Sequence, residues 1–276
     1  MEEFWARLHK PSGQPGPNYW TYFAKRLAHL ATIPRGATVL DLGTYDGNVL
    51  FEAMKKIKAQ GYGIGIDIDY DGFHAGVAEA IQRGWKEKVA FAQMDANMLG
   101  FLPETFHTVL ANFVGWDDCF DFERMEFLSS DKRVFEVMRV LRNGGQFGIG
   151  SWVEQCDIDW IAEEFRRYLP EGEKTGRKGI SCYARENAEG YRVILQNGGF
   201  KNISVYVETA DFISPDEETW WRQMKQAAND CFRQVPDPIT LESFKEQVFL
   251  DLQRFQNSEG ICFSKTVSFA FGTKLI

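Results

Sequence analysis

The sequence predicts an α/β fold: a doubly wound, seven-stranded, mostly parallel sheet with helices on both faces. Short apolar segments alternate with helical patterns from residue 37 onward, and such alternation is typical of right-handed parallel units. The final apolar segment, 262–271, has no helix after it. We therefore expect the last strand to be antiparallel. The 276 residues suffice for one large α/β domain or two small ones, with an ample core.

Residues 1–36 are expected to form an N-terminal segment and one helix before the first strand. Several Gly and Pro residues make positions 11–17 irregular. Apolar residues then recur at helical spacing up to Pro34. They are Tyr19, Tyr22, Phe23, Leu27 and Leu30. We expect this helix to act as a lid on a bound ligand; the alternative is that it only covers one face of the sheet.

Residues 37–276 are expected to form the main domain. Its strands are predicted at 37–42, 61–67, 88–94, 106–113, 146–152, 200–209 and 262–271. Its helices are predicted at about 47–59, 70–83, 130–141, 155–168, 184–197, 215–233 and 238–257. Asn143-Gly-Gly145 is typical of a left-handed helix cap, and Ser214 before Pro215 of a helix start. The last two helices, about 214–260, form an insertion before the final strand.

Charge and composition argue against several classes of protein. The net charge of −8, with Lys and Arg interspersed among acids, disfavours a nucleic-acid-binding protein. No apolar run approaches the roughly 20 residues of a membrane span, and the start is not that of a signal peptide. Five scattered cysteines support neither a disulfide framework nor a zinc site. We expect a cytoplasmic protein, and the sequence does not indicate its oligomeric state.

The stretch from Val39 to Gly47 predicts a ligand-binding turn. A buried strand ends at Gly43, turns, and passes into a helix near Gly47. Such a turn presents backbone N–H groups at a helix N-terminus without a side chain in the way. Asp67 follows Asp41 by 26 residues, the span of one strand–helix–strand step. Its carboxylate is therefore expected beside the turn, where it can accept both hydroxyls of a ribose.

Several motifs in order resemble the class I S-adenosylmethionine-dependent methyltransferases, over about residues 37–273. They are Val39-Leu-Asp-Leu-Gly-Thr-Tyr-Asp-Gly47, Gly65-Ile-Asp67, Phe91-Ala-Gln-Met-Asp-Ala96, Glu136-Val-Met-Arg-Val-Leu-Arg-Asn-Gly-Gly145 and the closing stretches Gly199-Phe-Lys201 and Val267-Ser-Phe-Ala-Phe-Gly-Thr-Lys274. The resemblance implies the family's Rossmann-like fold. Within the family, the spacing and the insertion look most like the ubiquinone/menaquinone-biosynthesis type, which methylates small molecules.

The resemblance also implies S-adenosyl-L-methionine as the cofactor, with S-adenosyl-L-homocysteine as its product. Asp95 would accept from the adenine amino group, or alternatively cap the segment from Asn97. Asp41 would orient the turn or meet the methionine ammonium through water. The expected cofactor-binding residues are Asp41, Gly43, Thr44, Gly47, Asp67, Ile68, Met94, Asp95, Ala96 and Asn112.

The sequence departs from the family pattern at two positions. Tyr45 replaces the middle glycine of the turn; we expect it to point away from the ligand and pack. His107 stands where many relatives carry an Asp, and it is either a hydrogen-bonded structural residue or a catalytic base. Acids at Trp116-Asp-Asp118 and Asp157-Ile-Asp159 do not match the spacing of a metal site, so no metal is expected.

Methyl transfer is an in-line displacement, which requires alignment in a water-poor site. Aromatic residues are expected to wall a site for a small-molecule acceptor, whose reacting atom could be C, O or N. They are Tyr19, Tyr22, Trp116, Trp152 and Tyr183. The alternative is a non-catalytic S-adenosylmethionine-binding module, for which Tyr45 argues. A nicotinamide dehydrogenase is disfavoured because the turn lacks the second glycine of its fingerprint.

Overall fold

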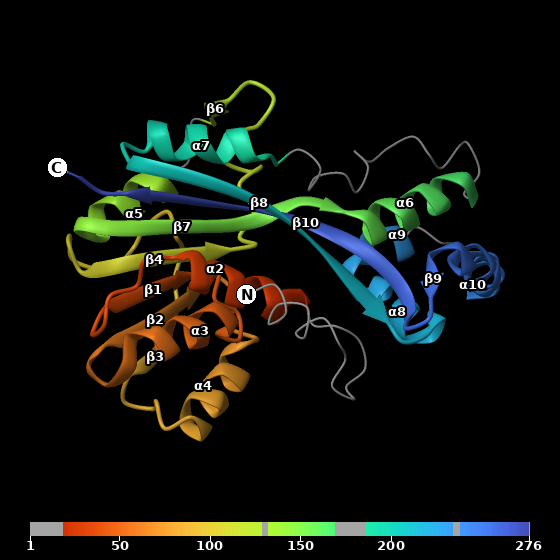
Figure 1. Ribbon diagram of the computed structural model, residues 1–276, viewed down its shortest axis with the longest axis horizontal. Helices are drawn as coiled ribbons and strands as arrows, with labels where there is room; N and C mark the ends of the chain where they lie inside the picture. Colours follow the sequence, from red (N-terminus) through yellow and green to blue (C-terminus); the bar gives the residue numbers. More distant parts are fainter. Residues whose placement is uncertain (1–18, 129–131, 169–185, 234–237, 276) are drawn as a thin grey trace. The chain divides into compact units, whose positions relative to one another are not determined.

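The computed structural model describes residues 19–128, 132–168, 186–233 and 238–275 (Figure 1). These residues form two compact units, which are described separately. The larger unit comprises the described residues of 20–152, 186–208 and 267–275. The smaller unit comprises Tyr19 and the described residues of 153–168, 209–233 and 238–266.

The described strands form one main sheet in the order β3-β2-β1-β4-β7-β10-β8. Their bounds are β1 Thr38–Leu42, β2 Tyr62–Asp67, β3 Val89–Gln93, β4 Phe106–Asn112, β7 Leu141–Gln155, β8 Lys201–Ser214 and β10 Gly260–Thr273. Strands β3, β2, β1, β4 and β7 pair in parallel, whereas β10 runs in the opposite direction (Figure 1). The predicted fold class is confirmed. A short strand, β9 (Gln256–Asn257), pairs with β10 and was not predicted.

Helices cover both faces of the sheet in the larger unit. Their bounds are α2 Tyr19–Leu30, α3 Asn48–Ile57, α4 Phe73–Gln82, α5 Arg133–Val140 and α7 Ala188–Asn197, with a 3₁₀ turn, η1, at Lys58–Gln60. Helices α5 and α7 pack on the face that carries Leu40, Leu42 and Phe147. Because side chains alternate along a strand, Val39 and Asp41 point to the opposite face. A two-stranded sheet, β5 (Phe120–Asp121) with β6 (Glu126–Phe127), was not predicted.

Strand β7 is longer than predicted, because Asn143-Gly-Gly145 does not end a helix before it. The three residues lie inside β7 as an irregularity: the pairing with β4 shifts from Phe106↔Leu141 to Thr108↔Gln146. Gly144 is left-handed, with φ of 78°. Its N–H donates to the Lys274 carbonyl at 2.7 Å. Pairing with the C-terminal residues, which are distant in sequence, thus extends the strand through the turn signal.

Strand β8 is also longer than predicted and ends at Ser214, so Ser214 is not the helix cap. Helix α8 (Glu217–Ala227) has Asp216 as its N-cap, whose side chain accepts from the Thr219 N–H at 2.7 Å. Ser214 Oγ instead donates to Gln223 Oε1. Asp and Ser are similarly good N-caps, so sequence preference alone did not separate them.

The smaller unit has its own aromatic core. It contains α6 (Cys156–Tyr168), α8, α9 (Asn229–Phe232), α10 (Pro238–Leu252) and a 3₁₀ turn, η4 (Gln253–Phe255). Trp160 and Trp220 stack against Phe263. Lys265, which is 1% exposed, is paired with Asp157 at 2.6 and 2.8 Å. The pairing offsets part of the cost of removing both charges from water.

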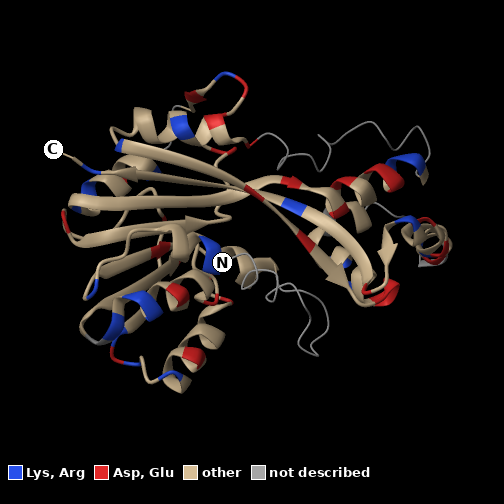
Figure 2. Cartoon of the chain, in the orientation of Figure 1, with Lys and Arg blue, Asp and Glu red and all other residues tan. Residues whose placement is uncertain are grey.

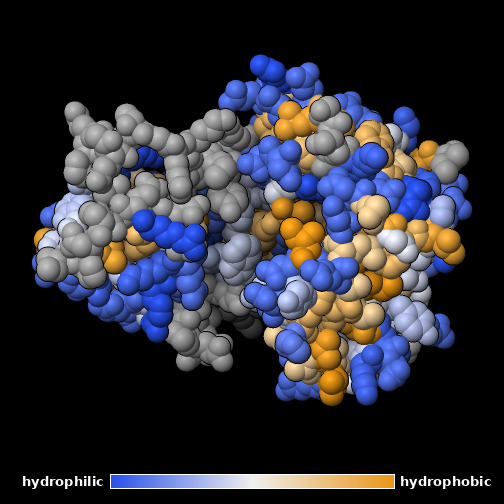
Figure 3. All heavy atoms as spheres, turned by 180° about the vertical axis from the view of Figure 1, so that it is seen from behind, coloured by the Kyte–Doolittle hydropathy of each residue, from blue (hydrophilic) through white to orange (hydrophobic). Residues whose placement is uncertain are grey.

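The surface carries mixed charge. Lys and Arg are interspersed with Asp and Glu along the helices (Figure 2). Apolar side chains reach the surface of the larger unit between polar ones (Figure 3). The exposed large apolar residues of this unit include Tyr45, Ile68, Tyr70, Met98 and Leu102. None of the helices in the described ranges is long and apolar enough to cross a membrane.

Helix α2 is attached to the rest of the larger unit by two sets of contacts in its C-terminal half. Lys56 Nζ, from α3, donates to the carbonyls of Ala28, His29 and Ala31 at 2.7–3.1 Å. These carbonyls belong to the last turn of α2 and the residue beyond it, where the helix leaves acceptors without intrahelical partners. Arg26 binds Glu208 of β8 through two nitrogens. The helix is thus an integral part of the fold; whether it also acts as a lid stays a prediction.

We expect Lys56→Met to lower the free energy of unfolding by about 1.5–3 kcal/mol, since it removes hydrogen bonds from a charged donor while keeping the aliphatic chain. Urea denaturation of the full chain measures the change. Lys55→Met is the matched control, because Lys55 is paired with Glu52 at the surface and such pairs contribute little. Equal stability of the two variants would show that the cap of α2 does not stabilise the fold.

Candidate functional site

The predicted cofactor residues gather at the carboxyl ends of the parallel strands in the larger unit. Strand β1 pairs with β2 in the register Asp41↔Gly65 and Leu42↔Ile66, and with β4 in the register Leu42↔Ala111. Asp67 and Asn112 are the last residues of their strands. The carboxyl edge of a parallel sheet, where the strand order reverses, is where such folds bind ligands.

The turn after β1 is closed by backbone hydrogen bonds. Thr44 N–H donates to the Ile66 carbonyl at 2.9 Å, and Gly47 N–H donates to the Thr44 carbonyl at 2.8 Å. Gly43 and Gly47 have φ of 65° and 90°, a region that glycine adopts at little cost. Helix α3 begins at Asn48 directly after this turn. Its first N–H groups are therefore presented at the edge of the sheet.

Asp41 holds the turn from inside. It is 1% exposed, and Oδ2 accepts from Thr44 Oγ1 at 2.7 Å. Burial raises the pKa of Asp41 to about 7, although hydrogen bonds from Thr44 and the Leu50 backbone oppose the shift. A buried carboxyl with this pKa changes charge near neutral pH. Its role in orienting the turn matches one of the two expected roles.

Asp67 lies directly beside the turn. Its Oδ2 accepts from the Tyr45 N–H at 2.9 Å, and its Oδ1 accepts from the Asp69 N–H at 3.1 Å. Each carboxylate oxygen can accept a second hydrogen bond, so both remain able to take a ligand hydroxyl. The carboxylate and the glycine turn thus form one group, which the spacing of the two motifs predicted.

Tyr45 does not pack as expected. Its side chain is 57% exposed, and its φ of 46° is left-handed. This conformation costs a non-glycine residue roughly 1–2 kcal/mol. The backbone of the turn therefore follows a path that glycine would favour, while the Tyr45 ring extends into solvent.

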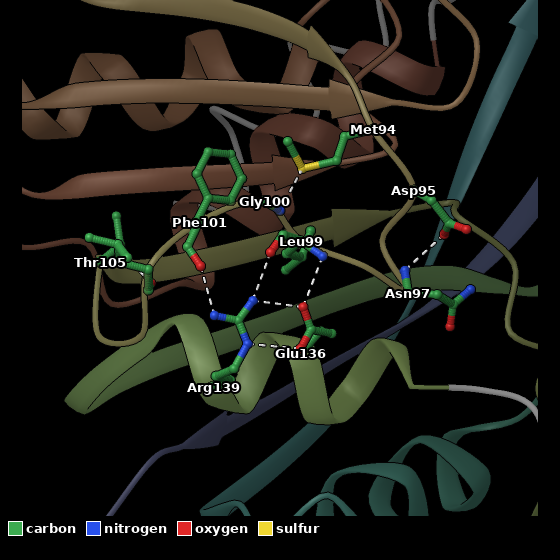
Figure 4. Close-up of polar contacts among 10 residues, drawn as sticks. Met94, Asp95, Asn97, Leu99, Gly100, Phe101, Thr105, Glu136 and Arg139 are labelled. Atoms are coloured by element: carbon green, nitrogen blue, oxygen red, sulfur yellow. Dashed lines mark hydrogen bonds and ion pairs between the residues drawn. The ribbon is translucent and has the colours of Figure 1, made fainter.

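The loop after β3, which ends at Gln93, carries Met94, Asp95 and Ala96; Figure 4 shows Met94 and Asp95. Asp95 is exposed, and its Oδ1 accepts from the Asn97 N–H at 2.8 Å, so the capping alternative is realised. Arg139 of α5 donates to the Leu99 and Phe101 carbonyls, each at 2.7 Å. The loop is thereby held against α5, and capping by one oxygen leaves Asp95 further acceptor capacity.

Asn112 presents a buried acceptor at the end of β4. Its Oδ1 is buried and has no hydrogen-bond partner among the described residues. A Cβ atom on Gly150, the paired residue of β7, would lie 2.3 Å from this oxygen. Glycine at 150 therefore makes the room that Asn112 occupies. An unpaired buried acceptor costs about 1–3 kcal/mol, which a ligand with an N–H or O–H donor would recover.

An aromatic cluster lies next to Asn112. The rings of Phe113 and Trp152 stack with centroids 4.0 Å apart and planes at 12°. Trp20 of α2 meets both rings edge-on, at 5.1 and 5.6 Å. Phe113 is left-handed, with φ of 57°, and such strained residues concentrate at functional sites. We call Trp20, Phe113 and Trp152 the aromatic wall.

The other aromatic residues predicted to contact a substrate have different surroundings. Tyr22 is buried and donates to Glu208 Oε1 at 2.8 Å. The Trp116 ring is fully buried under Arg133. Tyr19 belongs to the smaller unit, where its ring contacts Phe212. Tyr183 lies outside the described residues. Of the four residues that the structure describes, Trp152 alone belongs to the aromatic wall.

His107 is not brought to this edge. It is the second residue of β4, and five residues along a strand correspond to about 17 Å between it and Asn112. Its Nδ1 accepts from the Thr38 N–H at 3.0 Å, and its Nε2 lies 3.1 Å from Arg142 Nη1. Burial and the charge of Arg142 lower its pKa. These contacts agree with the structural alternative for His107, and its role as a catalytic base stays a prediction that its position in β4 does not favour.

Sequence reasoning missed Phe113 and Trp20 as parts of the site. Phe113 was predicted only as an apolar residue of its strand, and its left-handed backbone has no signature in the sequence. It also missed Glu186, a buried acid whose contacts are described below. The described residues contain no group of three or more His, Cys, Asp or Glu side chains that could hold a metal ion.

No family model matches the chain. Two curated proteins match parts of it at 32% identity. One is the aklanonic acid methyltransferase DauC of Streptomyces sp. (strain C5), over 36% of this chain and 44% of its own length. The other is the ubiquinone/menaquinone biosynthesis C-methyltransferase UbiE of Methylococcus capsulatus, over 46% of each chain. The matches thus span less than half the length of these relatives.

Solved structures resemble most of the chain. The YcgJ protein from Bacillus subtilis aligns with a TM-score of 0.57 and 16% identity, covering 94% of this chain and all of the other. Phosphoethanolamine N-methyltransferase 2 of Haemonchus contortus, in complex with phosphomonomethylethanolamine and S-adenosylhomocysteine, aligns with a TM-score of 0.52 and 15% identity, covering 95% and 54%. The [4+2]-cyclase SpnF aligns with a TM-score of 0.53 and 14% identity, covering 93% and 82%.

The mostly parallel sheet, the antiparallel β10 and the glycine turn after β1 agree with the fold expected from the sequence. The likeness to the solved structures extends over nearly the whole chain. This protein therefore has the fold of the class I S-adenosylmethionine-dependent methyltransferases.

Proposed function

We propose that this protein is an S-adenosylmethionine-dependent methyltransferase that methylates a small molecule at carbon, oxygen or nitrogen. The observation that carries the proposal is the joining of Asp67 to the glycine turn through the Tyr45 N–H. This contact supports the proposal because a carboxylate suited to bind ribose hydroxyls then lies beside an open helix N-terminus. The names of the two curated relatives and the S-adenosylhomocysteine complex of the N-methyltransferase support the same activity.

The residues present fit this cofactor. Asp67 retains acceptor capacity for two ribose hydroxyls, and Asp95 retains it for an amino group. The buried Oδ1 of Asn112 has no described partner, so it suits an ammonium or another N–H donor. When bound, S-adenosylmethionine supplies a methyl group on a positively charged sulfur. The proposed cofactor residues are those named from the sequence: Asp41, Gly43, Thr44, Gly47, Asp67, Ile68, Met94, Asp95, Ala96 and Asn112.

The aromatic wall supports an acceptor with an apolar, planar part. Trp20 is 45% exposed, whereas Trp152 is buried beneath it, so the wall has an accessible ring backed by a rigid stack. Flat rings stack favourably on such surfaces. A wall of this kind also excludes water from the reacting atoms, which favours alignment over hydrolysis. No described residue is assigned as a general base, since an acceptor that arrives deprotonated needs none.

The alternative function is a non-catalytic S-adenosylmethionine-binding module. The left-handed, exposed Tyr45 favours it, because the family's glycine is absent there. The cyclase SpnF, which aligns over 93% of this chain, illustrates that one fold hosts different reactions. Calorimetry with S-adenosylmethionine and S-adenosylhomocysteine is the first test, because failure to bind either excludes both functions. Transfer of a radiolabelled methyl group to a panel of phenols, quinones and amines then separates the enzyme from the module.

We expect Asp67→Ala to weaken S-adenosylhomocysteine binding by at least about 1.5 kcal/mol, or roughly tenfold, because hydrogen bonds to a charged group are lost. Calorimetry on the full chain gives the affinity. Asp71→Ala is the matched control, because Asp71 lies in the segment that follows Asp67, is exposed, and donates to Asp69 through its backbone N–H, which the substitution keeps. Unchanged affinity in Asp67→Ala would remove Asp67 from the cofactor site.

We expect S-adenosylmethionine to bind more tightly as the pH rises from 6 to 8. The pKa of Asp41 is raised to about 7 by burial, so Asp41 is protonated below pH 7 and negatively charged above it. The charged form attracts a cationic ligand, and the affinity should rise by at most about tenfold per pH unit, since one proton is linked to binding. Binding at pH 7 should therefore release protons.

Titration calorimetry in two buffers of different ionisation enthalpy counts the released protons. In Asp41→Asn, which cannot ionise, both the proton release and the dependence on pH should disappear, while S-adenosylmethionine should still bind. A pH dependence that persists in this variant would assign the effect to another group.

A further inference from the structure

Glu186 is a buried carboxylate that the proposed cofactor site does not use. It is 2% exposed and precedes α7 by one residue, Asn187, which caps that helix. Its Oε1 accepts from the Trp116 N–H at 2.5 Å. Its Oε2 accepts from Ser151 Oγ and from the Tyr191 hydroxyl in two short hydrogen bonds. The three donors come from the loop after β4, from β7 and from α7.

The carboxylate must stay ionised to keep all three donors. A protonated carboxyl has one O–H that donates, so it loses acceptor capacity. Burial raises the pKa of Glu186, while the bonds from Ser151, Tyr191 and Trp116 oppose the shift and the charge of Asp117 adds to it. The N-terminus of α7, a helix of 10 residues, also favours a negative charge at this position.

These contacts link Glu186 to the aromatic wall from two directions. Ser151 is bonded to Glu186 and directly precedes Trp152 in β7. Trp116 is three residues after Phe113, and Arg133 fixes the same loop by donating to the Gly115 carbonyl at 2.7 Å. The Phe113–Trp152 stack thus joins two segments that both bind one carboxylate.

We propose that Glu186 is a positioning residue of the acceptor side, which locks the loop after β4 to β7 and so holds Phe113 and Trp152 in one stack. Glu186 acts through its three donors and does not itself touch the wall. The assignment of the wall to the methyl acceptor rests on the proposed function. The positioning of the aromatic wall by Glu186 is argued from the hydrogen bonds of the larger unit and does not depend on the proposed function.

The test is fluorine NMR on the full chain labelled with 5-fluorotryptophan, with the resonances assigned by single Trp→Phe replacements. Glu186→Gln keeps the size of the side chain and can still accept from Trp116, but its amide nitrogen cannot accept from Ser151 or Tyr191. We expect the Trp116, Trp152 and Trp20 resonances to shift or broaden. Those of Trp85 and Trp220, which lie outside this network, should not change. Tyr22→Phe, which removes a hydroxyl from the partly buried Glu208, is the matched control and should leave the Trp116 resonance unchanged.

A pH titration separates positioning by the charge from a packing role. In the unaltered protein, the Trp152 resonance should move as Glu186 takes up a proton, at a pH above the range in which glutamates ordinarily do so. Glu186→Gln should abolish this titration. Other titratable groups near the network are Asp117 in the loop and, beside Tyr191, Cys119. Persistence of the titration in Glu186→Gln would overturn the proposal, as would a Trp152 resonance that stays fixed while Trp116 moves.

Two further measurements keep the outcome unambiguous. Tyr191→Phe removes one donor and retains the carboxylate, so it replaces Glu186→Gln if that variant does not fold. We expect it to shift the Trp152 resonance, but by less than the loss of the carboxylate would. Affinity for S-adenosylhomocysteine should be the same in Glu186→Gln and the unaltered protein, and its loss only in the variant would overturn an acceptor-side role. If neither protein binds it, the methyltransferase proposal fails while the fluorine shifts still decide the role of Glu186.

Discussion

The candidate site depends on the parallel pairing of β1 with β2 and β4. This register brings Asp41, Asp67 and Asn112, which are far apart in sequence, to one edge of the sheet. A shift of one residue would turn the buried residues of β1 to the opposite face, and it would carry Asp41 out of the turn that it supports. The core residues Leu40 and Leu42, both fully buried against α5 and α7, therefore hold the strand register on which the candidate site depends, in addition to the site's own hydrogen bonds.

The order of the elements was predictable because it follows from local patterns. Apolar strands, amphipathic helices and the Gly43–Gly47 turn each carry their own signal, and Asp67 could be placed because one strand–helix–strand step has a regular length. The errors arose where distant residues decide the outcome. The Gly144 turn signal was overridden by pairing with Lys274, and Ser214 stayed in a strand because β8 is extended beside β10.

Side-chain environment was less predictable than backbone structure. An aromatic residue such as Trp116 or Tyr22 carries no mark that distinguishes core from site, and both proved to be buried. Phe113 reads as a strand residue, yet its left-handed backbone aims its ring at Trp152. Glu186 contacts residues 70, 35 and 5 positions away, and no local pattern reports such a convergence. The sequence therefore did not predict which side chains, distant along the chain, contact one another.

The two fastenings of α2 differ greatly in the lengths of chain that they join. Lys56 reaches carbonyls only 25 to 28 residues earlier, so α2, β1 and α3 can associate soon after this stretch has been synthesised. The bond between Arg26 and Glu208 spans 182 residues and must wait until most of the chain has emerged. Contacts of short sequence separation close with a smaller loss of chain entropy and form sooner. Helix α2 is thus placed early against β1 and α3, and β8 completes its attachment late in folding.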